Sequence, residues 1–266
     1  MNLNPAVYII GAGPGDPELL TLKAYKILTK ADVILYANSL VPQQILQDVR
    51  DDAELIPTGN KVLEEIVEIA IARVKAGKSV VRLHSGDLSL YSAIGEQIQA
   101  FAAADIPYQL IPGLSAYQDA AAKLGIELTV PELVQTIILT RTSGQASPVP
   151  EREELATLAA HQASLCLYLS ARHVESAREK LLQHYPADTP VAVCYRLGWP
   201  DEEIWVVPLD KMAAITLEKN LIRTTLYVIS PALKELEGAR SQSDRGTRSR
   251  LYHPDHSHIF RPRKNV

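Results

Sequence analysis

The sequence predicts a protein of two α/β domains, and three observations support that fold class. Short apolar runs typical of strands alternate with amphipathic segments of helical period along most of the 266 residues. Several of the strand-like runs are followed directly by glycine-containing turns. Near residues 141–150 the composition changes to Thr, Ser, Gly and Pro, which indicates a linker between two α/β domains.

The first half of the chain alternates strand and helix. The first predicted helix has Asp16 as its N-cap, and Gly77 ends the second. Sequential strands separated by helices favour a mostly parallel sheet. We expect strands at 7–10, 33–36, 79–83, 108–111 and 136–140, with helices at 18–30, 62–74, 92–103 and 116–124.

The second half has a different pattern. The connection through Gly198 and Asp201 is too short for a crossover helix, so the strands on either side of it should be antiparallel and the sheet mixed. Domain limits follow at 1–140 and 141–236, with a polar, basic tail at 237–266. We expect strands near 165–169, 192–195, 204–207 and 226–229, and helices near 153–161, 174–184 and 210–220.

Bulk properties exclude several classes of protein. A net charge of −4 and a pI near 6.0 argue against a broad nucleic-acid-binding face. No apolar stretch is long enough to span a membrane, and the N-terminus lacks a basic signal region, which favours the cytoplasm. Cys166 and Cys194 lie in apolar runs, so we expect buried thiols without a disulfide.

The first glycine turn, G-A-G-P-G-D at residues 11–16, follows a strand and precedes a helix. Its spacing differs from the dinucleotide-binding pattern G-x-G-x-x-G. Asp16 and Glu18 place two carboxylates where a pyrophosphate would bind, and no acid ends the second strand to hold a ribose. A nicotinamide cofactor is therefore disfavoured. A tight turn that only connects strand to helix stays open as an alternative.

Two more turns of this kind follow strands, one at residues 84–87 and one at 111–116. Gly86 and Gly113 allow close approach of a ligand, and Ser85, Asp87 and Ser115 add polar groups. Ligands of open α/β sheets gather at the carboxyl ends of strands, so three such turns predict a ligand site. Asp87 has a second interpretation as a simple helix cap.

The three turns together, with S-G-D-L-S-L-Y at 85–91 and I-P-G-L-S at 111–115, resemble the tetrapyrrole methylases, the class III S-adenosylmethionine-dependent methyltransferases. The resemblance implies two α/β domains with a cofactor cleft between them, and a homodimer. Segments at 36–42, 128–141, 195–202 and 249–258 are similar to the branch that methylates C-11 of precorrin-4 or cobalt-precorrin-4 in cobalamin and porphyrin biosynthesis.

The resemblance also implies site residues. Leu169 and Leu197 have an alternative interpretation as core residues. Asp87 and Tyr91 are candidates for positioning, and no catalytic residue is named. The implied contacts of S-adenosylmethionine are Gly13, Pro14, Ser85, Gly86, Asp87, Leu90, Ser115, Ala116, Leu169, Leu197, Thr224 and Thr225.

The tetrapyrrole substrate carries many carboxylates, which arginine binds with two parallel hydrogen bonds. Arg141 and Arg196 follow strands in family-like loops and are the predicted substrate residues, with Tyr36 and Asn38 as further candidates. Each arginine has an alternative interpretation as a solvated surface residue.

An activated sulfonium methyl needs no nucleophilic side chain, and the sequence contains no Ser/His/Asp signature. The histidines and Asp255 of the segment 253–258 fit no common zinc spacing, so no metal is expected. Two alternatives stay open. One is another methylase of this fold, acting on a different precorrin, uroporphyrinogen III, ribosomal RNA or a protein, and the other is a non-catalytic nucleoside-binding sensor.

Overall fold

The computed structural model describes residues 3–143, 148–237, 256, 257 and 261 of the chain. The chain divides into two compact units, the first with residues 1–120 and 194–203 and the second with residues 121–193 and 204–266. Strands form two five-stranded sheets. Among the described helices, none combines the length and apolar character needed to cross a bilayer. Nearly all of the predicted tail lies outside the described residues.

The sheet of the first unit is parallel, as predicted. Because β4 inserts between β1 and β2, the carboxyl ends of β4, β1 and β5 are adjacent, and the three glycine turns begin side by side. The strands are β1 (Val7–Gly11), β2 (Val33–Tyr36), β3 (Glu54–Pro57), β4 (Val80–His84) and β5 (Tyr108–Ile111), in the spatial order β3-β2-β4-β1-β5.

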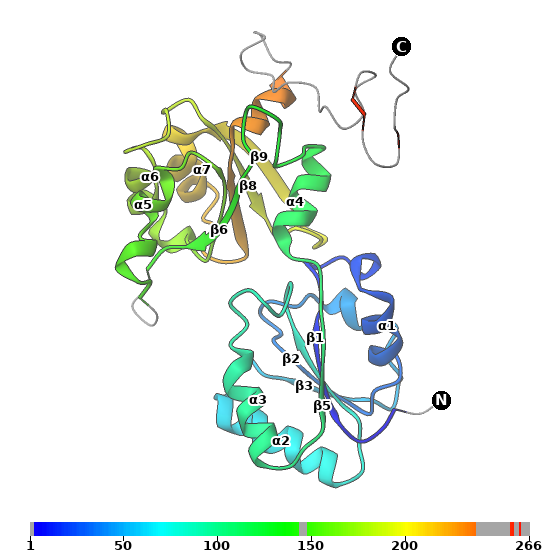
Figure 1. The fold of residues 1–266 in the computed structure, drawn as a ribbon. Coiled ribbons are helices and arrows are strands. Elements are labelled where there is room, and N and C mark those ends of the chain that lie inside the picture. Colours follow the sequence, from blue (N-terminus) through cyan, green and yellow to red (C-terminus); the bar gives the residue numbers. More distant parts are fainter. Residues whose placement is uncertain (1–2, 144–147, 238–255, 258–260, 262–266) are drawn as a thin grey trace. The chain divides into compact units, whose positions relative to one another are not determined.

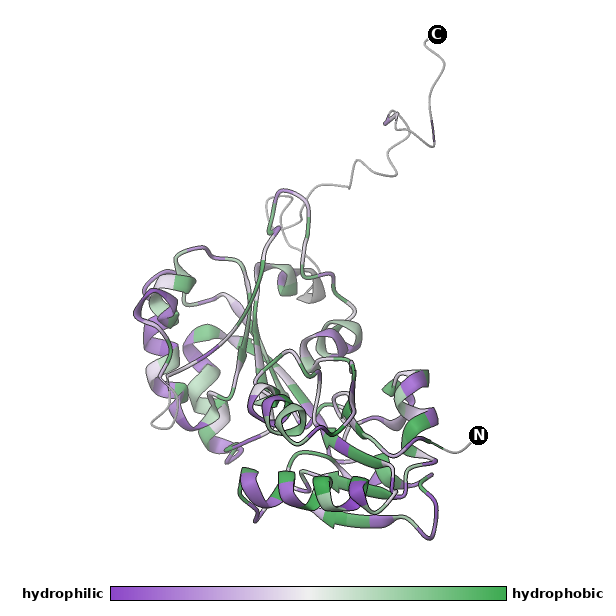
Figure 2. Ribbon diagram, turned by 60° about the horizontal axis from the view of Figure 1, so that its bottom comes forward, coloured by the Kyte–Doolittle hydropathy of each residue, from purple (hydrophilic) through white to green (hydrophobic). Residues whose placement is uncertain are grey.

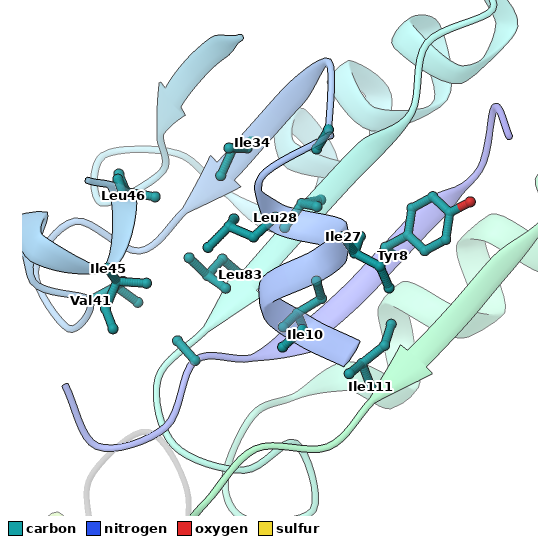
Figure 3. Packing of buried hydrophobic residues seen from close by; sticks show 14 of the residues in the cluster. Tyr8, Ile10, Ile27, Leu28, Ile34, Val41, Ile45, Leu46, Leu83 and Ile111 are labelled. Atoms are coloured by element: carbon teal, nitrogen blue, oxygen red, sulfur yellow. The ribbon is translucent and has the colours of Figure 1, made fainter. Parts of the chain in front are cut away.

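Helices cover both faces of this sheet, which explains its continuous apolar strands. One face packs against α1 (Leu22–Leu28), and the other packs against α2 (Leu63–Lys75) and α3 (Ile94–Ala103) (Figure 1). Figure 2 shows hydrophilic and hydrophobic residues alternating along the helices, while the strands are mostly hydrophobic. Figure 3 shows Ile27 and Leu28 of α1 lying over the strands.

The predicted helix at 18–30 begins later than expected. Asp16 caps only a short 3₁₀ helix, η1 (Pro17–Leu19). A second cap then starts α1 at Leu22, where the hydroxyl of Thr21 accepts a hydrogen bond from the N–H of Ala24 at 3.2 Å. Two consecutive caps divide the predicted helix because each satisfies its own first turn of N–H groups.

The second sheet is mixed, as predicted, since β6 runs parallel to β7 and β10 runs antiparallel to it. The helices α5, α6 and α7 lie together in this unit (Figure 1). The strands are β6 (Ile137–Arg141), β7 (Ser164–Tyr168), β8 (Pro190–Tyr195), β9 (Glu203–Pro208) and β10 (Thr225–Ile229), in the order β6-β7-β10-β8-β9, and the helices are α5 (Leu155–Ala159), α6 (Val174–Leu181) and α7 (Met212–Glu218). The helix α4 (Ala116–Leu124) begins in the first unit and ends in the second.

The strand predicted to close the first domain belongs instead to the second sheet. As β6 it pairs with β7 along its whole length. Hydrophobic periodicity identifies a strand but not its partner, so the sequence pattern left this pairing undetermined. The compact units divide after Ala120, earlier than the predicted limit at residue 140. Cys166 and Cys194 are buried free thiols, as predicted.

Candidate active site

The three glycine turns pack main chain against main chain. The N–H of Gly13 donates to the carbonyl oxygen of Gly86 at 3.2 Å, and the N–H of Gly86 donates back to Gly13 at 2.8 Å. A Cβ on Gly11 would lie 2.6 Å from that oxygen of Gly86, and a Cβ on Gly113 would lie 2.4 Å from it. No side chain fits these gaps, so this part of the site is bare main chain.

Asp87 ties the turn after β4 to the turn after β5. One carboxylate oxygen accepts from the N–H of Gly113 at 3.1 Å, and the other accepts from the N–H of Ser89 at 2.9 Å and from its hydroxyl. Burial alone would raise the pKa of Asp87, but these hydrogen bonds, with one from Leu88, outweigh it and lower the pKa. The helix-cap alternative is wrong, because α3 begins only at Ile94.

The loop between Asp87 and α3 contains two strained residues. Tyr91 has a φ of 54° and Ala93 a φ of 47°, both in the left-handed region that costs side-chain-bearing residues about 1–2 kcal/mol each. The hydroxyl of Ser92 donates to the carbonyls of Asp87 at 3.1 Å and Leu90 at 3.2 Å. The predicted residues Leu90 and Tyr91 are therefore held in one defined loop.

The other predicted cofactor residues of this part of the chain lie on the same turns. Pro14 follows Gly13 in the turn after β1, and Ser85 directly follows β4. Ser115 is buried at the start of α4, where its N–H donates to the side-chain oxygen of Gln118 at 2.9 Å. Ala116 is the first residue of that helix. The first unit thus gathers these predicted residues along one edge of its sheet.

The turn between β8 and β9 holds Arg196 and Leu197. Arg196 has a φ of 49°, and its guanidinium pairs with Asp201 and lies 4.9 Å from the ring centroid of Trp199. Stacking on an aromatic face and pairing with a carboxylate fix the plane of the guanidinium. Leu197 is buried with 4% of its surface exposed, so the core interpretation fits it as well as a ligand contact does.

Two weaker substrate candidates, Tyr36 and Asn38, follow β2. The side-chain oxygen of Asn38 accepts from the N–H of Gly59 at 3.0 Å, and the carbonyl of Tyr36 accepts from the N–H of Thr58 at 2.9 Å. Both residues therefore connect the end of β2 to the end of β3, beside the glycine turns of the same sheet edge.

In the second unit, four predicted residues lie at the same end of three neighbouring strands, β6, β7 and β10. Arg141 is the last residue of β6 and pairs with Tyr168 of β7, which directly precedes Leu169. Because β10 runs antiparallel to β7, its start, with Thr224 and Thr225, lies at the same edge. Pairing across the sheet therefore collects residues that are far apart in sequence.

Leu169 and Thr224 carry signs of a ligand site. Both have a φ of 52°, an uncommon conformation that is especially unfavourable for a β-branched threonine. The Thr224 hydroxyl is buried and has no hydrogen-bond partner among the described residues. Leu169 is 66% exposed, so its interpretation as a core residue is wrong. Backbone strain, an unpaired hydroxyl and an exposed leucine at one edge favour contact with a ligand.

Sequence reasoning missed a buried polar group on β4. Arg82 donates to the side-chain oxygens of Gln97 at 3.3 Å and Thr58 at 3.1 Å, and burial lowers its pKa to about 10. Burial, helped by the charge of Arg82 and opposed by a hydrogen bond with Gln97, lowers the pKa of His84 to about 3. The available signal was the V-V-R-L-H run, where polar residues alternate within an apolar strand.

Gln44 is the other residue that the sequence did not indicate. It lies in a 3₁₀ helix, η2 (Gln43–Leu46), and donates hydrogen bonds to two turns of the first unit. Its neighbour Gln43 is also polar, so nothing in the pattern distinguished the two residues.

Metal ligands do not gather in the part of the chain that the structure describes, where no group of three or more His, Cys, Asp or Glu side chains could hold an ion. His253, Asp255 and His258 of the tail lie outside the described residues. That the protein uses no metal stays a prediction.

Comparison with known proteins agrees with this arrangement. The precorrin-4 C(11)-methyltransferase of Pseudomonas aeruginosa is 43% identical over 96% of this chain and 98% of its own length. A crystal structure of a cobalt precorrin-4 methyltransferase of cobalamin biosynthesis matches with a TM-score of 0.82 and 38% identity, over 86% of this chain and 96% of that one.

A third match is the uroporphyrin-III C-methyltransferase of Thermus thermophilus in complex with S-adenosylhomocysteine, at a TM-score of 0.73 and 28% identity over 86% of this chain and 99% of that one. Residues 6–213 match the family model for tetrapyrrole (corrin/porphyrin) methylases. That match spans most of both sheets and all three glycine turns. The chain therefore belongs to the tetrapyrrole methylase family.

Proposed function

We propose that this protein transfers a methyl group from S-adenosylmethionine to C-11 of precorrin-4 or cobalt-precorrin-4 in cobalamin biosynthesis, and releases S-adenosylhomocysteine. The observation that carries the proposal is the meeting of three bare main-chain turns at the carboxyl ends of β4, β1 and β5 in a tetrapyrrole methylase. The names of the Pseudomonas relative and of the cobalt precorrin-4 methyltransferase support this substrate.

The chemistry of the turns fits a sulfonium cofactor better than a phosphate-bearing one. Asp16, Glu18 and Asp87 place negative charge near the turns, which favours a cation and disfavours a pyrophosphate. A Cβ at Gly11 or Gly113 would clash with main chain of a neighbouring turn, so these glycines allow the three turns to pack in direct contact. The bound S-adenosylhomocysteine of the Thermus methyltransferase supports the same cofactor.

The chain's own contribution to the reaction is positioning. Bound S-adenosylmethionine supplies an activated methyl group, and the electron-rich ring carbon of the substrate attacks it without a protein nucleophile. Asp87 is unsuited to accept a proton, because Ser89 and Gly113 already donate to both of its oxygens and its pKa is lowered. We assign Asp87 and the Tyr91 loop to holding the turns in place and excluding water.

Two arginines are proposed to bind substrate carboxylates. The guanidinium of Arg196 lies over the rings of Tyr195 and Trp199, at 5.2 and 4.9 Å from their centroids. Arg141 donates to the carbonyl of Thr142 at 3.2 Å at the end of β6. Tyr36 and Asn38 are proposed to contribute from the end of β2. Pairing of arginine with carboxylates is directional and orients the ring.

Methylation of uroporphyrinogen III is the second candidate function. The Thermus methyltransferases support it, but with lower identity and lower TM-scores than the cobalt precorrin-4 methyltransferase. The test is incubation of the purified protein with labelled S-adenosylmethionine and each of precorrin-4, cobalt-precorrin-4 and uroporphyrinogen III. Label at C-11 of a precorrin supports the first proposal, whereas label only in uroporphyrinogen III, or none, contradicts it.

We further propose that the protein is a cytoplasmic homodimer. Light scattering of the purified protein at several concentrations measures its mass, and cell fractionation gives its location. A mass that stays at 29.2 kDa would contradict the dimer.

Asp87→Asn is expected to weaken S-adenosylhomocysteine binding roughly tenfold, because an amide NH₂ would face an N–H that now donates to a carboxylate. Isothermal titration calorimetry measures the change. Asp105→Asn is the matched control, because Asp105 is exposed beyond α3 and in a left-handed conformation that asparagine tolerates. Equal affinity of both variants would contradict the assigned role of Asp87.

Arg141→Ala is expected to raise the KM for the tetrapyrrole by roughly tenfold to a hundredfold, the effect of losing a hydrogen-bonded charge, with little change in cofactor affinity. Steady-state kinetics with each substrate varied separates the two effects. Arg152→Ala is the control, since that side chain is 88% exposed in the same unit. An equal loss for both substrates would argue for a general structural role.

A further inference from the structure

Gln44 joins two turns that carry proposed cofactor residues. Its side-chain nitrogen donates to the carbonyl oxygen of Gly15 at 2.8 Å and to that of Gly198 at 2.6 Å. An amide NH₂ has two hydrogens, and these two carbonyls use both. Gly15 directly follows Pro14, and Gly198 directly follows Leu197. Each hydrogen bond therefore fixes main chain next to a proposed cofactor contact.

The two turns also pack directly on each other. A Cβ on Gly15 would lie 2.7 Å from Cδ1 of Trp199, and a Cβ on Gly198 would lie 2.5 Å from the N atom of Asp16. Gly198 has a φ of 75°, a conformation that glycine adopts without strain. These contacts prevent a closer approach of the two turns, and a bridge between them limits their separation.

The bridge itself is anchored in the core. Ile45 and Leu46, the residues after Gln44, are buried in the cluster beneath α1, together with Val41. Figure 3 shows these three side chains in that cluster. The main chain of Gln44 is therefore fixed, and its amide cannot follow the turns if they move apart.

We propose that Gln44 is a positioning residue, whose two amide donors hold the turn at 13–16 and the turn at 196–202 at the spacing that the cofactor requires. The inference rests on the proposed S-adenosylmethionine-dependent function. A site that is already in its bound geometry avoids the cost of ordering its loops when the ligand binds. Loss of the donors should therefore weaken cofactor binding more than it destabilises the fold.

Variants of Gln44 that differ in hydrogen-bond donors test this role. Gln44→Glu keeps the shape but turns an acceptor toward two carbonyls, and Gln44→Met keeps the length without donors. Both should raise the Kd for S-adenosylhomocysteine and the KM for S-adenosylmethionine roughly tenfold or more. Gln44→Lys keeps hydrogen-bond donors at this position and should retain most of the affinity for S-adenosylhomocysteine. Gln43→Glu makes the same charge change at the exposed neighbouring residue and should bind as the wild type does.

Calorimetry with S-adenosylhomocysteine, steady-state kinetics and thermal unfolding are measured on all five proteins. Loss of affinity in the Glu and Met variants, with retention in the Lys variant and a similar unfolding temperature, supports the role. Wild-type affinity in Gln44→Glu overturns it while leaving the proposed function intact. Equal losses in the Glu and Lys variants, together with a lower unfolding temperature, also overturn it. A wild type that does not bind S-adenosylhomocysteine overturns the proposed function and this inference together.

Discussion

Gly113→Ala should lower kcat/KM roughly a hundredfold, the effect of moving reacting groups by about an ångström. The added Cβ would lie 2.4 Å from the carbonyl oxygen of Gly86 and 2.6 Å from that of Gly11. Both atoms belong to main chain, so relief requires the turn after β5 to move away from the turns after β1 and β4. Overpacking of this kind also destabilises a fold by about 1–3 kcal/mol. Kinetics and urea unfolding measure the two effects.

Two further glycine variants separate steric from conformational causes. Gly86 has a φ of 68° but no neighbour within 4 Å of an added Cβ, so Gly86→Ala adds strain without a clash. Gly95 has neither problem and lies in the first turn of α3, where alanine should be neutral or stabilise by about 0.5–1 kcal/mol. Activity should fall most in Gly113→Ala and least in Gly95→Ala. Wild-type activity in Gly113→Ala would contradict the bare main-chain site.

Much of the fold could be predicted because its elements have strong local signals. The helix α4 begins and ends where the pattern predicts, and Gly77 has the left-handed φ of 79° expected at a helix end. The strand β3 had no such signal, since it is a short edge strand with exposed residues and a terminal Pro57. Edge strands need neither a continuous apolar run nor every N–H donor, so periodicity does not reveal them.

The site was predictable in its turns but not in its contacts. Glycine turns after strands indicate a ligand edge, yet only the insertion of β4 between β1 and β2 makes the three turns neighbours. The hydrogen bond from Ser89 to Asp87 is local, but the one from Gly113 joins two turns that only this strand order brings together, so the sequence does not reveal it. Nothing in the sequence indicated that Leu169 is exposed, since leucine is usually a core residue.

The free energy of unfolding should fall as the pH drops below about 6.5, and His84 should account for much of this fall above pH ~5. In the folded protein burial lowers the pKa of His84 to about 3, whereas an unfolded histidine titrates near 6.5. Between these values the unfolded chain binds one more proton. The contribution of His84 to the free energy of unfolding is therefore complete above about pH 6.5. It is lost as the pH falls toward about 3, by up to about 1.4 kcal/mol per pH unit.

His84→Gln should remove that slope, because glutamine does not titrate and can keep a hydrogen bond to Gln97. His161→Gln, the same change at an exposed histidine of the second unit, is the matched control. Urea unfolding of the three proteins at about pH 7.5 and pH 5 measures the difference, in a range where most carboxylates stay ionised. The same slope in wild type and His84→Gln would mean that the imidazole becomes protonated without unfolding. The interpretation of His84 as a neutral, buried histidine next to the Ser85 turn would then be wrong.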